Sequence, residues 1–149
     1  VLVNKNIRRA HPNDVAALTV AIDKAYARFK DQIDDLPDVS SGLTDDVKDH
    51  DVWLIELDGI VAGCVVLKHH CDVTLVANLA VDPHHSGSGL GRDLMALAEE
   101  RARAAHHNKM RLSTHQKMPG NIAYYERLGW QVSEMSPPKV IMSKVLNDR

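Results

Sequence analysis

Three glycines at alternating positions, Gly87, Gly89 and Gly91, stand between an apolar run and a long amphipathic pattern. Glycine adopts positive φ angles and lets a ligand approach the main chain, and the start of a helix leaves amide groups unbonded with a partial positive charge. The segment therefore predicts a phosphate or pyrophosphate site. It lacks the Gly-Lys-Ser/Thr ending of a P-loop, and a hairpin-rich region precedes it, so a pyrophosphate-bearing carrier fits better than a nucleoside triphosphate or a dinucleotide.

The histidines and cysteines, the other residues with obvious chemistry, are expected to have structural roles. The nine histidines include the pairs His69-His70, His84-His85 and His106-His107. Neighbouring residues point to opposite faces of a strand and diverge by about 100° on a helix, so these pairs are poor chelators and no metal site is expected. Cys64 and Cys71 fall in strand-like apolar runs, where we expect reduced, buried thiols and neither a disulfide nor a nucleophile.

Strands and helices that position these residues follow from the hydrophobic periodicity. A first strand is expected around Leu2 and Ile7. Further strands are predicted over Val52–Leu57, Ile60–Lys68, Asp72–Val81, Met110–Thr114, Trp130–Glu134 and Val140–Leu146. The Asp58-Gly59 pair between the first two of these is typical of a tight antiparallel hairpin.

Helices are predicted over residues 12–29, 44–50, 90–106 and 121–128. Pro12 suits the first turn of the first helix, and Thr44 is predicted as the N-cap of the second because its hydroxyl can accept from a free amide. Gly129 is expected to stop the last helix.

The resulting order is β-α-α-β-β-β-α-β-α-β-β, which predicts an α/β fold with a mixed, mostly antiparallel central sheet flanked by helices on both faces. The chain has 149 residues, a usual length for one domain, so a single domain over residues 1–149 is expected. With 44% hydrophobic and 26% charged residues, the composition is that of a globular protein.

Several classes of partner are not expected. Eighteen Lys and Arg stand against 20 Asp and Glu, a formal charge of -2, so no positive field attracts nucleic acid. The longest apolar runs, such as 60–67 and 74–81, are much shorter than the ~20 residues that span a bilayer, and no membrane partner is expected. Residues 1–9 lack the features of a secretory signal, so we expect a cytoplasmic location.

Two motifs carry a family resemblance. The first is Leu79-Ala80-Val81-Asp82-Pro83 followed by Ser86-Gly87-Ser88-Gly89-Leu90-Gly91, and the second is Asn121-Ile122-Ala123-Tyr124-Tyr125-Glu126-Arg127-Leu128-Gly129-Trp130. In this order and separation they resemble the GNAT superfamily of acetyl-CoA-dependent N-acetyltransferases. The closing Met142-Ser143-Lys144-Val145-Leu146 strand is similar to the family's ending, and the predicted elements match the family fold over nearly the whole chain.

The resemblance implies that this chain transfers an acetyl group from acetyl-CoA to a primary amine of a small-molecule or peptide acceptor. The amine would attack directly in a ternary complex, without a metal. The loop from Ser86 to Gly91 would hold the CoA pyrophosphate, main-chain groups of Leu79 and Val81 would pair with the pantetheine arm, and an amide near Val81 would meet the oxyanion. The implied cofactor-binding residues are Leu79, Ala80, Val81, Ser86, Gly87, Ser88, Gly89, Leu90, Gly91, Arg92, Asn121 and Tyr125.

The same resemblance places Asn121 near the pantetheine and Tyr125 near the thioester sulfur, as the general acid that protonates the leaving thiolate. Helical geometry agrees with this assignment. Asn121 and Tyr125, four residues apart, share one face of the helix, whereas Tyr124 points with Leu128 toward the core.

This chain departs from the family pattern in two places. Ser86 stands where Gln or Arg is common, which removes a long side-chain donor but keeps the backbone amides. The strand before the loop often carries an acidic general base, and here it has Val76-Ala77-Asn78. The candidates for the base are His115, His84, His85 and Glu56, each acting directly or through water, and a base with a pKa near 7 makes histidine chemically reasonable. His115 is taken with Tyr125 as the catalytic candidate because of its position in the chain, just after the predicted fifth strand.

An acidic run between Asp31 and Asp51 follows the first helix. Such runs are usually solvated, but this region commonly forms the acceptor rim in the family, so a cationic acceptor is expected: a small polyamine, an aminoglycoside-like amine or a basic peptide. The resemblance also makes a homodimer through the last strands an expected assembly.

Two other functions compete with the enzyme. A non-catalytic acyl-CoA-binding module, with a sensor or regulatory role, would keep the glycine loop and lack the base, as the Val76-Ala77-Asn78 stretch does. A protein-interaction domain that uses exposed strand edges would bind no CoA at all.

Overall fold

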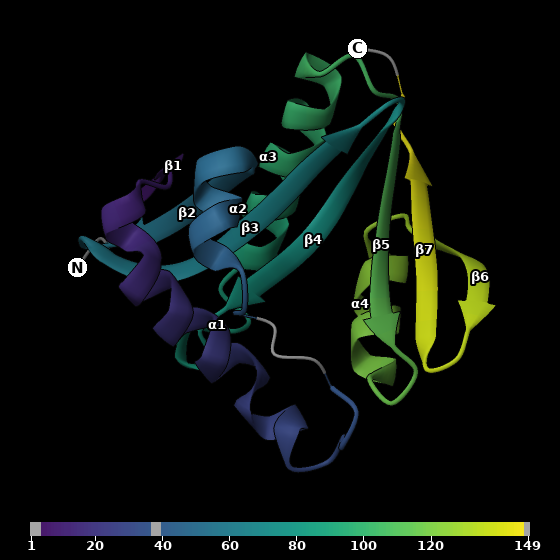
Figure 1. The fold of residues 1–149 in the computed structure, drawn as a ribbon, viewed down its shortest axis with the longest axis horizontal. Helices are drawn as coiled ribbons and strands as arrows, with labels where there is room; N and C mark the ends of the chain where they lie inside the picture. Colours follow the sequence, from purple (N-terminus) through teal and green to yellow (C-terminus); the bar gives the residue numbers. More distant parts are fainter. Residues whose placement is uncertain (1–3, 37–39, 148–149) are drawn as a thin grey trace.

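A computed structural model describes residues 4–36 and 40–147 of the chain. Within these residues, seven strands form one sheet in the order β1-β2-β3-β4-β5-β7-β6 (Figure 1). The strands are β1 (Lys5–Arg9), β2 (Asp51–Leu57), β3 (Ile60–His70), β4 (Val73–Val81), β5 (Lys109–His115), β6 (Gln131–Ser136) and β7 (Lys139–Val145). The mixed, mostly antiparallel sheet expected from the sequence is confirmed.

Helices cover both faces of the sheet, as predicted (Figure 1). They are α1 (Val15–Lys30), α2 (Leu43–Asp49), α3 (Leu90–Ala104) and α4 (Pro119–Arg127), with 3-10 turns η1 (Pro12–Asp14) and η2 (Pro83–His85). On one face, Leu18 and Ile22 of α1 pack against Leu54 and Cys64. On the other face, the side chains of α3 and α4 share a core with Trp130, which is 2% exposed.

The β4–β5 pair is the one feature of the sheet that shapes a site. It is the parallel pair, and its register includes only Thr74 with Met110 and Leu75 with Arg111. Beyond this point the two strands diverge, which Figure 1 shows as a V-shaped opening below their shared upper end. The opening separates the antiparallel half β1–β4 from the half formed by β5, β7 and β6.

Some local predictions are confirmed and others are wrong. Asp58 and Gly59 both have positive φ angles (51° and 82°) and form the predicted hairpin turn between β2 and β3. Thr44 is not the N-cap of α2, because Gly42 adopts a φ of 80° and caps the helix itself, one residue before the buried Leu43. Cys71 is not buried, since the turn after β3 brings it to the surface at a φ of 47°.

Three further points concern the first strand, the end of the third helix and the membrane. Leu2, in the predicted first strand, lies outside the described residues. The third helix ends at Ala104, because His106 turns into the left-handed region at a φ of 64°. In the part of the chain that the structure describes, no helix combines the length and the apolar character needed to cross a membrane.

A buried polar chain closes the narrow end of the sheet, near the β4–β5 pairing. Asp51 is 6% exposed and accepts from His69 Nε2 at 2.9 Å, and His69 Nδ1 lies 2.9 Å from the hydroxyl of Thr74. The same hydroxyl lies 2.9 Å from His107 Nδ1, and His107 Nε2 donates to the Cys71 carbonyl at 2.8 Å. The chain ties β2, β3 and β4 to the segment after α3.

Candidate active site

A cleft of about 640 Å³ lies where α1, the end of β4, the glycine loop and α4 come together. Its lining includes eleven of the predicted cofactor-binding residues: Leu79, Ala80, Val81, Ser86, Gly87, Gly89, Leu90, Gly91, Arg92, Asn121 and Tyr125. Ser88 does not line the cleft, because its hydroxyl turns back to the His85 carbonyl. Two segments some 30 residues apart in sequence therefore face one another across one cavity, with α1 as a third wall.

The glycine loop offers the cleft a set of main-chain amides. Gly87 and Gly89 have φ angles of 83° and 85°, which side-chain-bearing residues rarely adopt. The first hydrogen bond of α3 runs from the Asp93 amide to the Gly89 carbonyl at 3.0 Å. The amides of Leu90, Gly91 and Arg92 precede that bond and have no acceptor within the helix, so they are available to an anion at its positive end.

Three arginines from three different elements line the same cleft: Arg28 of α1, Arg92 of α3 and Arg127 of α4. Guanidinium groups bind phosphate oxygens with paired hydrogen bonds, so the cleft is suited to a ligand with several phosphates. Only Arg92 was predicted from the sequence. Arg28 and Arg127 give no local signal, because each lies on the polar side of an ordinary amphipathic helix and joins the site through the fold.

The edge of β4 offers backbone groups to the opening. The Asp82 amide donates to the Ala62 carbonyl of the neighbouring chain segment at 2.8 Å. Since backbone groups alternate along a strand, those of Leu79 and Val81 face the other way, toward the gap between β4 and β5. The hydroxyl of Tyr26 donates to the Leu79 carbonyl at 3.5 Å, which agrees with this direction. Tyr26 belongs to the site, although the sequence pattern places it among the apolar, core-facing positions of the first helix.

Tyr124 packs against the core, as predicted, but it also reaches the cleft. It is only half-buried, it lines the cleft, and its hydroxyl lies beside Gly91. The guanidinium of Arg127 stands 6.0 Å from the centre of its ring. Burial raises the pKa of Tyr124, although Arg92 and Arg127 counteract part of that effect. Tyr124 therefore belongs to the phosphate end of the cleft.

Tyr125 lies deeper in the molecule. Its side chain is 8% exposed and packs against Trp130 with ring centres 6.1 Å apart. Asn121 and Tyr125 line the same cavities, as expected from their shared helix face. Burial raises the pKa of Tyr125, and the nearby Tyr26 and Tyr124 raise it further. Its hydroxyl thus stays protonated over the physiological range, the state that a general acid requires.

A second cavity of about 300 Å³ occupies the gap between the diverging ends of β4 and β5. Tyr26, Leu79, Asn121 and Tyr125 line both this cavity and the cleft, so the two spaces meet at these four residues. The walls of the second cavity are largely apolar and include Leu36, Val76, Leu112, Met118 and Pro138. Its charged lining residues, among those described, are Asp35 and Lys139.

His115 is the last residue of β5 and lines the second cavity. It is 8% exposed. Its Nε2 lies 2.7 Å from Oδ1 of Asp35, and its Nδ1 accepts a hydrogen bond from the Lys117 amide at 3.1 Å. The hydrogen bond from His115 lowers the pKa of Asp35. Of the four base candidates, His115 is the one that the fold brings to this cavity.

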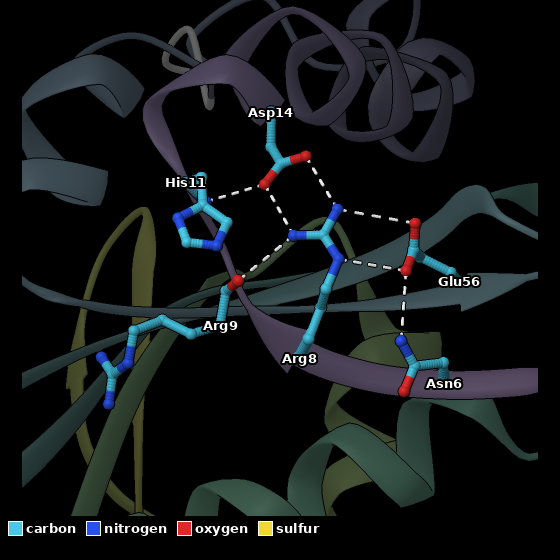
Figure 2. Close-up of polar contacts among 6 residues, drawn as sticks. All are labelled: Asn6, Arg8, Arg9, His11, Asp14 and Glu56. Carbon is cyan, nitrogen blue, oxygen red and sulfur yellow. Dashed lines mark hydrogen bonds and ion pairs between the residues drawn. The ribbon is translucent and has the colours of Figure 1, made fainter.

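The other three base candidates lie elsewhere. Glu56 accepts from Arg8 at 3.1 Å within a network that also holds Asp14, and it lines neither cavity (Figure 2). His84 is 82% exposed and bonds to Asp82. His85 lines the cleft beside the glycine loop, away from the second cavity.

The acidic run does not form a ring of carboxylates. Asp35 lines the second cavity, whereas Asp34 is exposed and outside it. Asp46 pairs with Lys68 at 3.5 Å, and Asp51 is buried in the polar chain at the far end of the sheet. Asp38 lies outside the described residues. The predicted acceptor rim is thus reduced to a single described carboxylate.

Metal ligands and nucleophilic thiols are not assembled here. In residues 4–36 and 40–147, no group of three or more His, Cys, Asp or Glu side chains could hold a metal ion. Cys64 is fully buried in β3, and burial raises its pKa to about 12. Neither Cys64 nor Cys71 lines the cleft or the second cavity.

The fold has counterparts among known proteins. The family model of the acetyltransferase (GNAT) domain matches residues 48–132. The chain is similar to the PaiA N-acetyltransferase of Thermoplasma acidophilum, solved with coenzyme A, at 17% identity and a TM-score of 0.83 over 95% of this chain and 99% of that one.

Two further solved structures share the fold. The ribosomal-protein-S18-alanine N-acetyltransferase of Escherichia coli is 18% identical, with a TM-score of 0.81 over 98% of this chain and 96% of that one. The putative acetyltransferase YncA of Salmonella typhimurium, solved with its cofactor acetyl-CoA, is 20% identical, with a TM-score of 0.76 over the same shares.

Proposed function

The chain belongs to the acetyltransferase (GNAT) family, and we propose that it transfers the acetyl group of acetyl-CoA to a primary amine of a small-molecule or peptide acceptor. One observation carries this proposal. The 640 Å³ cleft and the 300 Å³ cavity meet at Leu79, Asn121 and Tyr125. A thioester bound in the first space can therefore reach an amine bound in the second, which is the requirement for direct transfer in a ternary complex.

The lining of the cleft supports acetyl-CoA as its ligand. The free amides of α3 and the three arginines suit the phosphates, and the edge of β4 suits the amide-bearing pantetheine arm. PaiA and YncA, which share the fold, were solved with coenzyme A and acetyl-CoA respectively. We therefore take acetyl-CoA as the co-substrate and place its pyrophosphate at the loop from Ser86 to Gly91.

Tyr125 is the proposed general acid. Tyr125 lines both spaces, and its buried, protonated hydroxyl would give its proton to the departing CoA thiolate. The main-chain amide of Val81, which faces the opening, would stabilise the negative charge that develops on the acetyl oxygen. The acceptor amine attacks uncharged and loses a proton to water at the mouth of the second cavity, and Tyr125 regains a proton from water after the thiol has formed. His115 is proposed to act on the acceptor side, because it lines that cavity.

Calorimetric titration with acetyl-CoA and with free CoA, followed by thiol release against a panel of primary amines, tests the proposal. We expect both ligands to bind and thiol to appear only when an amine is present. Binding without release across the panel would favour a non-catalytic acyl-CoA-binding module. Absence of binding to either ligand would overturn the assignment of the cleft.

A further inference from the structure

Asp35 and His115 form a pair at the second cavity although they are separated by 80 positions in the sequence. His115 is held by the end of β5, and Asp35 follows α1. Asp35 is 57% exposed at its side chain, whereas the His115 side chain is 7% exposed. The carboxylate therefore stands at the mouth of the cavity and the imidazole stands behind it.

The hydrogen bonds of His115 fix where its ring proton lies. The Lys117 amide can only donate, so the Nδ1 atom that it contacts at 3.1 Å must be unprotonated and accept. A neutral ring then carries its proton on Nε2 and donates it to Asp35 at 2.7 Å. Both nitrogens are occupied, and no lone pair remains to take a proton from the amine. His115 thus serves as a positioning residue for the carboxylate.

Asp35 is left with one oxygen for a ligand. Its Oδ1 is bonded to His115, and its Oδ2 makes no hydrogen bond or ion pair with another described residue. The bond from His115 lowers the pKa of Asp35, with a smaller contribution from Lys117, so the carboxylate stays ionised. Lys139 also lines the cavity and Lys117 lies near its mouth, so Asp35 is the negative group in a locally mixed field.

On the premise of the proposed function, we propose that Asp35 selects acceptors that carry a second positive charge, and that His115 holds it in place for this role. The charge in question is not the reacting amine. That amine must arrive uncharged at Tyr125, where the two spaces meet. Asp35 lines the second cavity and not the cleft.

The walls between these two points define the rest of the acceptor. Leu36, Val76, Leu112 and Met118 are apolar and suit an aliphatic chain. The acceptor class is therefore an aliphatic primary amine with a second ammonium or guanidinium group at its far end.

The test compares a primary alkylamine with the diamine of the same chain length, at low ionic strength. We expect a lower KM for the diamine with the native chain. Asp35→Asn should reduce the preference for the diamine by about fivefold, mainly through KM, because an ion pair at an exposed site is lost. Asp34→Asn removes the same charge one residue away, outside the cavity, and should leave the preference unchanged.

His115 variants test the positioning role. His115→Phe should reduce the diamine preference as Asp35→Asn does, whereas His115→Gln, whose amide can still donate to Asp35, should restore part of it. A general base would instead lower kcat for both amines in either variant. Equal KM values for monoamine and diamine in the native chain, with active transfer, would overturn the proposal and leave the proposed function intact.

Calorimetry of the diamine against the CoA-saturated protein separates the two proposals. Diamine binding that is lost in Asp35→Asn, without thiol release from any amine, would support the role of Asp35 and refute the transferase. Diamine binding that is the same in both chains would refute the role of Asp35.

Discussion

The hydroxyl of Tyr124 lies so close to Gly91 that a Cβ at this glycine would stand 2.5 Å from the phenolic oxygen. The φ angle of Gly91 is not among the positive ones, so the backbone itself would accept a side chain there. Contact with Tyr124, and not backbone conformation, therefore requires glycine at this position of α3. Gly87 and Gly89 differ, because their positive φ angles would strain another residue although no close atom stands in its way.

A double-mutant cycle tests this distinction. Gly91→Ala should displace Tyr124 and raise the Kd of acetyl-CoA by about tenfold, an effect of about 1.4 kcal/mol. In a Tyr124→Phe chain the nearest atom is the ring carbon at 3.4 Å, an ordinary contact, so the same change should cost much less. Calorimetry on the native chain, the two single variants and the double variant gives the coupling free energy between the two positions in acetyl-CoA binding. An undiminished penalty in the Tyr124→Phe chain would show that the ligand, and not Tyr124, requires the glycine.

Neutralising the arginines of the cleft should weaken acetyl-CoA binding in a salt-dependent way. Arg28→Gln and Arg127→Gln are each expected to raise Kd by about fivefold at low ionic strength, and by less at high salt, because partly exposed charges are screened. Arg111 of β5 is exposed and lines neither cavity, so Arg111→Gln is the matched control. Equal changes in all three variants would indicate a general charge effect and no phosphate site.

Removal of the Tyr125 hydroxyl should affect turnover and not cofactor binding. Tyr125→Phe keeps the ring that packs against Trp130 and loses the proton of the proposed acid, so we expect kcat to fall by about 100-fold with little change in the Kd of acetyl-CoA. Tyr124→Phe is the control on the neighbouring residue, with kcat expected near the native value. A native kcat in Tyr125→Phe would remove the general acid from the mechanism.

The parts of the site that could be predicted from the sequence are those fixed by local geometry. Positive φ angles at Gly87 and Gly89, and the shared face of Asn121 and Tyr125, follow from residue type and helical spacing. Arg28 gave no such signal. Its helix has an ordinary amphipathic pattern, and only its packing across the end of β4 makes it part of the cleft.

The Asp35–His115 pair could not be predicted because it depends on the divergence of β4 and β5. That divergence is a property of strand pairing, and no residue near either partner encodes it. The burial of Asp51 could not be predicted either. It closes an acidic run that is typical of solvated loops, yet it is 6% exposed because β2 begins with it.

Around Asp51, hydrogen bonds converge from four different parts of the chain. His69 connects the carboxylate to the hydroxyl of Thr74, and that hydroxyl also contacts His107. Arg9 and Arg101 hold the Asp51 carboxylate from the other side at 2.7 and 2.9 Å.

Acid should therefore destabilise the fold through Asp51. Burial alone would raise its pKa, but hydrogen bonds from His69, Arg101 and Trp53 lower it to about 2. The folded pKa is thus below the unfolded value of about 4, so the stabilisation is present above that value and is lost as the pH falls from about 4 to about 2. Asp51→Asn should lower the free energy of unfolding by about 2 kcal/mol at neutral pH. In this variant the midpoint of urea denaturation should fall less steeply as the pH is lowered from about 4 to about 2, which we call the acid limb. The exposed Asp72 offers the control, since Asp72→Asn should keep the acid limb, and an unchanged limb in Asp51→Asn would refute the assignment.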